Sequence, residues 1–133
     1  MRSLIFAGIQ RYSLFSPNHV GNDAAIFSAV AQYLKENGHQ VNMYTEQEFL
    51  TNSLKGEKYI FTMMRSKASV RKLQKLEEKE DCFAVNSGHG IENCTRERMT
   101  TLLLENQISH PRSLIWDTND GVPELSLIHI SEP

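Results

Sequence analysis

The run Leu4-Ile5-Phe6-Ala7-Gly8 places four apolar side chains together near the start of the chain and closes them with a glycine. A continuous apolar run is typical of a strand in a parallel sheet, because helices cover both faces of such a strand and its side chains do not alternate with polar ones. We therefore expect the first strand here. A long loop should follow from Gly8 to Gly21, and long loops in compact domains are often functional.

Strands and helices are expected to alternate along the rest of the chain. Asn22 or Asp23 is placed to cap a helix that Gly38 ends. Similar patterns predict strands over residues 40–45, 59–63 and 82–85, and a fifth strand that begins at residues 113–116. They also predict helices over 47–52, 67–81 and 95–106, and a glycine-bearing turn over 87–90. In the last helix the inward residues should be Met99, Leu102 and Leu103. The alternation predicts an α/β protein with a Rossmann-like open parallel sheet of about five strands and helices on both faces.

The composition argues against several classes of partner. The 133 residues fall within the size of one compact domain. Lys and Arg number 14 and Asp and Glu number 16, so the net charge of -2 provides no broad attraction to nucleic acid or anionic lipid. No apolar stretch approaches the roughly 20 residues of a membrane-spanning helix, and the amino-terminal run is too short for a secretory signal. We predict a cytoplasmic protein with neither nucleic-acid nor membrane partners.

The carboxyl-terminal residues 125–133 resemble the in-frame translation of a sequencing adaptor from a transposon end. The plainer interpretation is an apolar strand that stops at Pro133. We favour the adaptor, and we therefore expect native sequence over residues 1–124 only, as one domain of a longer protein. Candidate site residues are confined to this range.

Ligands of open parallel sheets bind beyond the carboxyl ends of the strands, where helix amino termini and free backbone amides converge. Asn18 and His19 follow the first expected strand and are candidates for substrate contact, although such a loop also forms for the sake of the turn alone. Ser87 opens the turn over residues 87–90, which either cradles an anion through its amides or is a plain turn. His89 in that turn is a weak candidate for a general base, because the sequence identifies no carboxylate neighbour for it.

The stretch from Val85 to Thr100 and its continuation from Leu102 to Pro111 resemble the ATP-grasp superfamily of ligases. In that family a strand ends in Asn-Ser or Asn-Pro, as at Asn86-Ser87. An acidic-basic pair then opens a helix, as at Glu97-Arg98, and a turn of the form small-x-Pro follows. Upstream, residues 63–66 and 69–77 are similar to the third strand and helix of the family, so the resemblance spans most of residues 1–120.

The resemblance implies that residues 1–124 are the amino-terminal, substrate-side domain of an ATP-dependent ligase. Such an enzyme uses ATP and Mg²⁺ to activate a carboxylate as an acylphosphate, and it then passes the acyl group to an amine or another nucleophile. The metal ligands, and the glycine-rich loop with its lysine, belong to the downstream part that this chain lacks. The chain alone is therefore expected to be inactive, and its expected partner is a small-molecule or peptide carboxylate.

The resemblance also implies roles for individual residues. Arg98 takes the position of a basic residue that reaches the nucleotide phosphates, a task that suits the guanidinium fork. A surface arginine near the start of a helix is the alternative. Arg65, Asn86 and Ser87 are expected to line the substrate cleft. No residue of the chain is identified as a metal ligand or as a catalytic group.

Two other functions stay open. Residues 18–21 before a helix and 34–41 after it are similar to the acceptor-binding amino domain of glycosyltransferases, which predicts a second Rossmann-like half downstream. A stand-alone Rossmann-like binding module predicts a natural stop near residue 124 and a ligand that binds without ATP. The strand that ends at Asn86-Ser87 and the helix that holds Arg98 favour the ligase.

Overall fold

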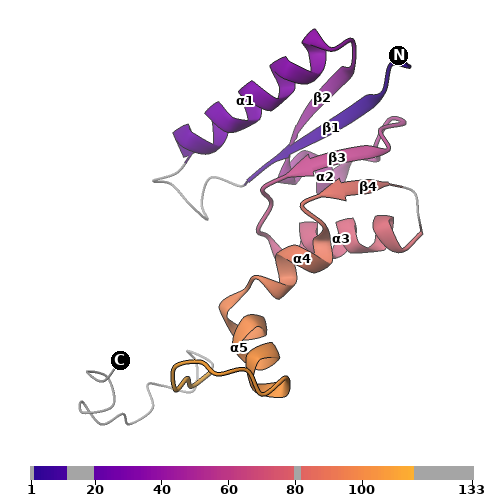
Figure 1. Ribbon diagram of the computed structural model, residues 1–133. Helices are drawn as coiled ribbons and strands as arrows, with labels where there is room; N and C mark the ends of the chain where they lie inside the picture. Colours follow the sequence, from indigo (N-terminus) through magenta and orange to yellow (C-terminus); the bar gives the residue numbers. More distant parts are fainter. Residues whose placement is uncertain (1, 12–19, 80–81, 116–133) are drawn as a thin grey trace. The chain divides into compact units, whose positions relative to one another are not determined.

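The computed structural model describes residues 2–11, 20–79 and 82–115 (Figure 1). The chain divides into two compact units, Met1–Glu92 and Asn93–Pro133. α4 (Gly88–Asn93) ends at the boundary between them, and α5 (Arg96–Glu105) belongs to the second unit. The first unit contains β1 (Ile5–Gln10), α1 (Val20–Glu36), β2 (Gln40–Thr45), α2 (Glu46–Thr51), β3 (Tyr59–Thr62), α3 (Lys67–Glu78) and β4 (Phe83–Val85).

The strands of the described residues form one parallel sheet in the order β2-β1-β3-β4. Ile9 of β1 is the register partner of Tyr44 in β2 and of Thr62 in β3, and Ile60 of β3 is the partner of Ala84 in β4. Parallel neighbours need crossover connections, and α1, α2 and α3 lie in those connections. The expected α/β class with a parallel sheet is confirmed.

Helices cover both faces of this sheet. On one face, Phe49 of α2 and Leu73 of α3 pack with Ile60 in the core. On the other face, Phe27 of α1 stacks on Phe61 of β3, with ring centroids 5.3 Å apart. Ile60 and Phe61 are adjacent in one strand, so their side chains point to opposite faces of the sheet.

The first strand is longer than the apolar run predicts. β1 continues to Gln10, and Gly8 lies inside it instead of closing it. A Cβ atom at Gly8 would lie 2.6 Å from Met43 Sδ and 2.6 Å from Phe61 Cζ. Any larger residue here would force the Met43 or Phe61 side chain to shift, because these side chains of the neighbouring strands pack directly against the backbone.

The first helix begins earlier than expected. α1 starts at Val20, so Asn22 and Asp23 lie in its first turn and not at its cap. Asp23 still suits this position, because a negative charge near a helix amino terminus is favourable. Gly38 follows the helix with φ +85° and is confirmed as the residue that ends it.

Two expectations for the later part of the chain are corrected. Residues 87–90 are not a plain turn, because residues 88–90 form the first turn of helix α4, and a Cβ at Gly88 would lie 2.8 Å from Gln74 Cγ of α3. The fifth strand expected to begin at residues 113–116 does not start at residues 113–115, which have no regular secondary structure, and Trp116 and the residues after it lie outside the described residues. The sheet therefore has four strands in the part of the chain that the structure describes.

In the second unit, α5 buries none of its residues. Met99 was expected to point inward but is 47% exposed, while Leu102 and Leu103 are only partly buried. The apolar spacing predicted the helix correctly but not a packed face, because spacing does not specify what a helix packs against. Across residues 2–11, 20–79 and 82–115, no helix combines the length and apolar character needed to span a membrane.

Candidate functional site at the carboxyl edge of the sheet

The segments that follow the parallel strands meet at the carboxyl edge of the sheet, where open α/β sheets bind ligands. Residues 62–66, which we call the β3–α3 connection, receive polar side chains from the neighbouring strands. Arg11, directly after β1, donates from Nε to the Met63 carbonyl oxygen at 3.3 Å. Asn86, directly after β4, donates from Nδ2 to the Thr62 carbonyl oxygen at 3.2 Å. The β3–α3 connection is thus held from both sides.

The third contact to this connection comes from Glu46, at the start of α2. Its carboxylate oxygen Oε1 accepts hydrogen bonds from the backbone N–H groups of Arg65 and of Ser66, the latter at 3.3 Å. Ser66 is the N-cap of α3, and its hydroxyl accepts from the N–H of Ser69 at 3.1 Å. The carboxylate therefore lies where the amides and the dipole of α3 favour a negative charge. The Glu46 carboxylate is therefore the anion that binds at the amino terminus of α3.

Glu46 is only 2% exposed. Its second oxygen, Oε2, is buried and has no hydrogen-bond partner among the described residues. Burial of a carboxylate oxygen without a partner is costly, so the bonds that Oε1 receives must offset that cost. Sequence reasoning missed this residue, because a glutamate in the first turn of a short helix normally faces solvent.

Arg11 also forms an ion pair with Asp23 of α1, with Nε 3.3 Å from Oδ2. Both side chains are less than one-fifth exposed, at 18% and 17%. A partly buried pair of this kind is stronger than a surface pair and fixes the orientation of both groups. The guanidinium therefore links the end of β1 to both α1 and the β3–α3 connection. The only sign of this pairing in the sequence is a basic residue that follows the first apolar strand.

Three of the predicted site residues lie along this edge. Arg65 is exposed in the β3–α3 connection, and Asn86 is exposed after β4. Ser87 hydrogen-bonds to the first turn of α4. Its hydroxyl accepts from the N–H of Gly90 at 3.0 Å, and its carbonyl oxygen accepts from the N–H of Ile91 at 2.9 Å. Because β3 and β4 are neighbours in the sheet, the segments that hold Arg65 and Asn86 are adjacent.

Three predicted site residues remain, namely Asn18, His19 and Arg98. Asn18 and His19 are outside the described residues. Arg98 belongs to the second unit, where its N–H donates to the Thr95 hydroxyl at 3.3 Å and its Nε donates to Asn93 Oδ1 at 3.4 Å. These contacts place Arg98 in the first turn of α5 with an exposed side chain.

His89 has a carboxylate neighbour that the sequence did not reveal. Its Nε2 lies 3.6 Å from Glu78 Oε1, near the end of α3. The two side chains are 56% and 63% exposed, so solvent screens their interaction. The pair has the character of a surface contact and not of a catalytic dyad.

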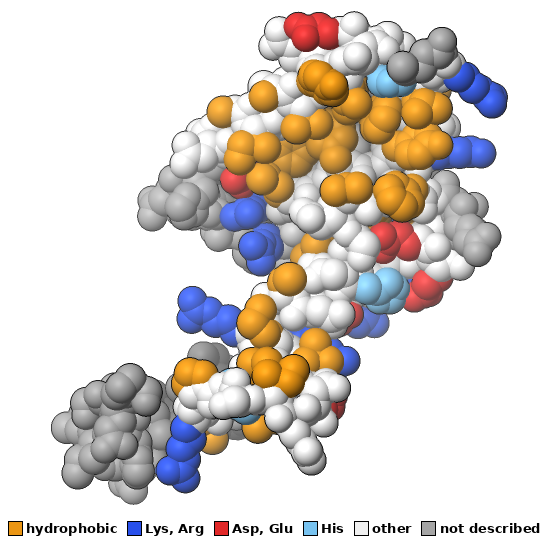
Figure 2. Space-filling view, in the orientation of Figure 1, with side chains coloured by type: hydrophobic (Ala, Val, Ile, Leu, Met, Phe, Trp, Pro, Cys, Tyr) orange, Lys and Arg blue, Asp and Glu red, His pale blue; other side chains and the backbone are white. Residues whose placement is uncertain are grey.

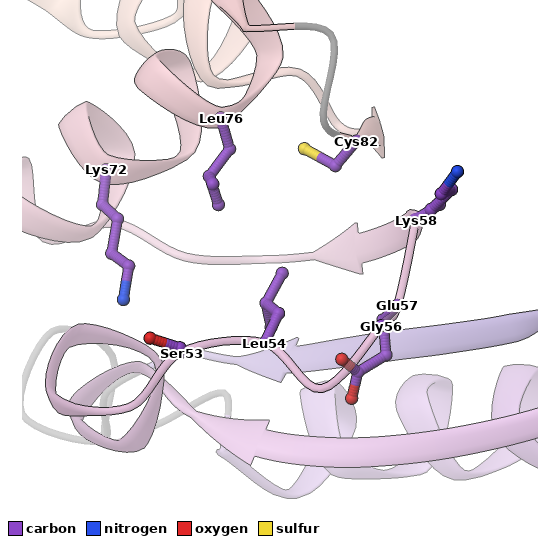
Figure 3. Close-up of a pocket in the computed structure, with 8 residues that line it drawn as sticks. All are labelled: Ser53, Leu54, Gly56, Glu57, Lys58, Lys72, Leu76 and Cys82. Atoms are coloured by element: carbon purple, nitrogen blue, oxygen red, sulfur yellow. The ribbon is translucent and has the colours of Figure 1, made fainter.

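A separate pocket of about 330 Å³ lies on the face of the sheet that α3 covers (Figure 3). Figure 3 shows Leu54 and Leu76 pointing into it from opposite sides. Lys72 does not present a free charge there, because its Nζ donates to the carbonyl oxygens of Phe49 and Asn52. The pocket is lined by Ser53, Leu54, Gly56, Glu57, Lys58, Lys72, Leu76 and Cys82.

Glu57 in the wall of this pocket is 3% exposed and fully hydrogen-bonded. Its Oε1 accepts from Asn42 Nδ2 at 2.8 Å and from the Tyr44 hydroxyl at 2.5 Å, and its Oε2 accepts from the N–H of Lys55. Burial acts to raise the pKa of Glu57, but the hydrogen bonds outweigh burial and lower it. The bond to Glu57 raises the pKa of Tyr44 to about 12. This carboxylate fastens the segment between α2 and β3 to β2.

A search of known protein families, of curated proteins and of solved structures finds no match to this chain. The described residues contain no group of three or more His, Cys, Asp or Glu side chains that could hold a metal ion.

Proposed function

We propose that residues 1–124 are the Rossmann-like, substrate-side amino domain of a cytoplasmic ATP-dependent ligase of the ATP-grasp type. In this proposal the downstream part of the parent protein binds ATP and Mg²⁺ and forms the acylphosphate. The observation that carries the proposal is the convergence at the carboxyl edge of the sheet. There, Arg11, Glu46 and Asn86 all hydrogen-bond to the β3–α3 connection, which presents the exposed Arg65.

Arg65 is the group best suited to bind a substrate carboxylate. A guanidinium offers two parallel N–H donors that match the two oxygens of a carboxylate. Its backbone is held by Glu46, so the arginine projects from a fixed segment. The bound group would be the carboxylate of a small molecule or of a peptide, and Arg98 in the second unit would be directed to the nucleotide phosphates.

Carboxylate binding can be measured on this chain directly by titration with succinate and with glutamate, followed through the backbone amide signals of residues 62–66 in ¹⁵N NMR spectra. We expect shifts in the β3–α3 connection. Arg65→Gln should weaken binding by about tenfold or more, the equivalent of roughly 1.4 kcal/mol. Lys67→Gln is the matched control, because it removes the same charge from an exposed position two residues away. Equal weakening in both variants would reveal only a general charge effect and would contradict the proposal.

The ligase assignment itself is tested in two ways. The chain should not hydrolyse ATP in the presence of Mg²⁺, and robust Mg²⁺-dependent turnover would show that its own residues complete an active site. Source DNA read outward past the codon for Glu124 should continue into a glycine-rich loop with a lysine and into acidic metal ligands. A stop codon directly after this region would instead support a stand-alone binding module.

A further inference from the structure

The two faces of the sheet are not equally covered near β4. Ala84 points toward the α2 and α3 side and is 9% exposed, whereas its neighbours Phe83 and Val85 are 66% and 57% exposed. Alternation along the strand places Phe83 and Val85 on the face that α1 covers. α1 contacts β1 and β2, and it reaches Phe61 of β3 through Phe27. Strand β4 is therefore left open on that face among the described residues.

α1 carries a second apolar stripe beside its buried one. Ile26, Val30 and Tyr33 are spaced four and three residues apart, so they lie along one flank of the helix. They are 50%, 37% and 67% exposed, whereas Phe27 and Ala31 on the inner side are buried. Figure 2 shows hydrophobic side chains gathered in a broad patch over α1 and the strands. A helix that needs only one apolar face to pack on its sheet does not account for this second stripe.

The surface involved is large enough to bury in a specific interface. The five exposed side chains together present on the order of 500 Å² of apolar surface, given that one aromatic residue alone carries about 150–250 Å². A patch of this size lies at the upper end of what a monomer shows. Two such patches facing each other would bury about 1,000 Å², which is the lower limit for a specific protein interface.

We propose that this face binds a second copy of the chain. The two halves of the patch suit each other, since the α1 stripe is a convex helix flank and the open side of β4 is a strip of sheet that lacks a covering helix. A two-fold axis brings the helix of each copy onto the sheet of the other, because both halves lie on the same face of one molecule. All five side chains are uncharged, so two identical surfaces meet there without like-charge repulsion.

Sedimentation velocity of the whole chain tests this proposal over a concentration range of about 1 to 300 µM, which spans the dissociation constants expected for a small interface. We expect a monomer–dimer equilibrium. Phe83→Ser and Tyr33→Ser should each raise the dissociation constant by about tenfold or more, since each removes a large apolar contact from one half of the patch. Leu50→Ser is the matched control, because Leu50 is an exposed apolar residue, 39% exposed, on α2 at the opposite face.

A chain that stays monomeric over the whole range would overturn the proposal, whether the face is then bare or is covered by another part of the parent protein. A dimer that Leu50→Ser weakens as much as Phe83→Ser does would overturn it too, since apolar contact would then not be confined to this face. Should Phe83→Ser prevent folding by circular dichroism, Tyr33→Ser still decides the result, because Tyr33 is a solvent-facing helix residue. Neither outcome depends on carboxylate binding at the carboxyl edge of the sheet.

Discussion

The hydroxyl of Tyr44 donates a hydrogen bond of 2.5 Å to the buried carboxylate of Glu57, which lies 13 residues further along the chain. Asn42 and the N–H of Lys55 complete the set of donors to that carboxylate. The interaction joins β2 to the segment that leads into β3. Because both partners titrate, it makes the stability of the fold depend on pH at two separate limits.

At the alkaline limit, we expect stability to fall between pH 10 and pH 12. The pKa of Tyr44 is raised in the folded state from 10.0 to about 12, chiefly by its bond to Glu57. Its contribution to stability is therefore complete below pH 10 and is lost as the pH rises toward 12. Tyr44→Phe should be less stable by about 1 kcal/mol at neutral pH, and its loss of stability over this range should be smaller. Urea unfolding at a series of pH values measures both effects.

The control for the alkaline limit is Tyr33→Phe, because the ring of Tyr33 is 67% exposed and lies away from this network. It should keep the alkaline loss of the natural chain. A Tyr44→Phe variant whose alkaline profile matches that of the natural chain would contradict the role of the hydrogen bond.

At the acid limit, we expect protonation of Glu57 to lower the stability of the fold. Its pKa in the folded state is lowered from 4.5, so its contribution is present above pH 4.5 and is lost as the pH falls through the lowered value. Glu57→Gln should cost about 1–3 kcal/mol at neutral pH, because an amide cannot accept hydrogen bonds on its nitrogen from the donors around it. The difference between the two proteins should shrink on acidification. If the difference stayed constant from neutral pH to pH 3, ionisation of Glu57 would not be its source.

Removal of the Glu46 side chain should weaken the carboxyl edge of the sheet. Glu46→Ala leaves the N–H groups of Arg65 and Ser66 without their acceptor, and we expect a loss of about 2–3 kcal/mol in the free energy of unfolding. Glu48→Ala is the matched control, since Glu48 is exposed in the same helix turn, and it should change stability by less than about 0.5 kcal/mol. Similar losses for the two variants would show that the buried carboxylate does not support α3.

Two glycine substitutions should differ in their effect on thermal stability. Gly8→Ala forces a Cβ against Met43 and Phe61 at 2.6 Å, and overpacking of this kind costs about 1–3 kcal/mol. Gly21→Ala places its Cβ where nothing lies within 4 Å, and in the first turn of α1 it should be neutral or stabilising by up to about 1 kcal/mol. Calorimetry should therefore give a lower melting temperature for the first variant only.

The candidate site was partly visible in the sequence. Arg65 and Asn86 were selected through the family resemblance, and both follow strands whose carboxyl ends meet at this edge of the sheet. Arg11 and Glu46 were not found, because their importance lies in partners 52 and 19 residues away. Arg98 was selected by resemblance alone, and the structure places it in the second unit.

The sequence by itself determined the class of the fold and most of its elements. The strand over residues 40–45 was predicted with its observed bounds, and the helix that begins at Lys67 was predicted to within a few residues of its observed end at Glu78. These features follow from local periodicity and from the conformational preference of residues such as Gly38. Tertiary structure alone decided that Gly8 lies within a strand, that Glu46 is buried, and that Phe83 faces outward. Each of these outcomes depends on packing between residues that are distant in the sequence, and local sequence patterns do not specify that packing.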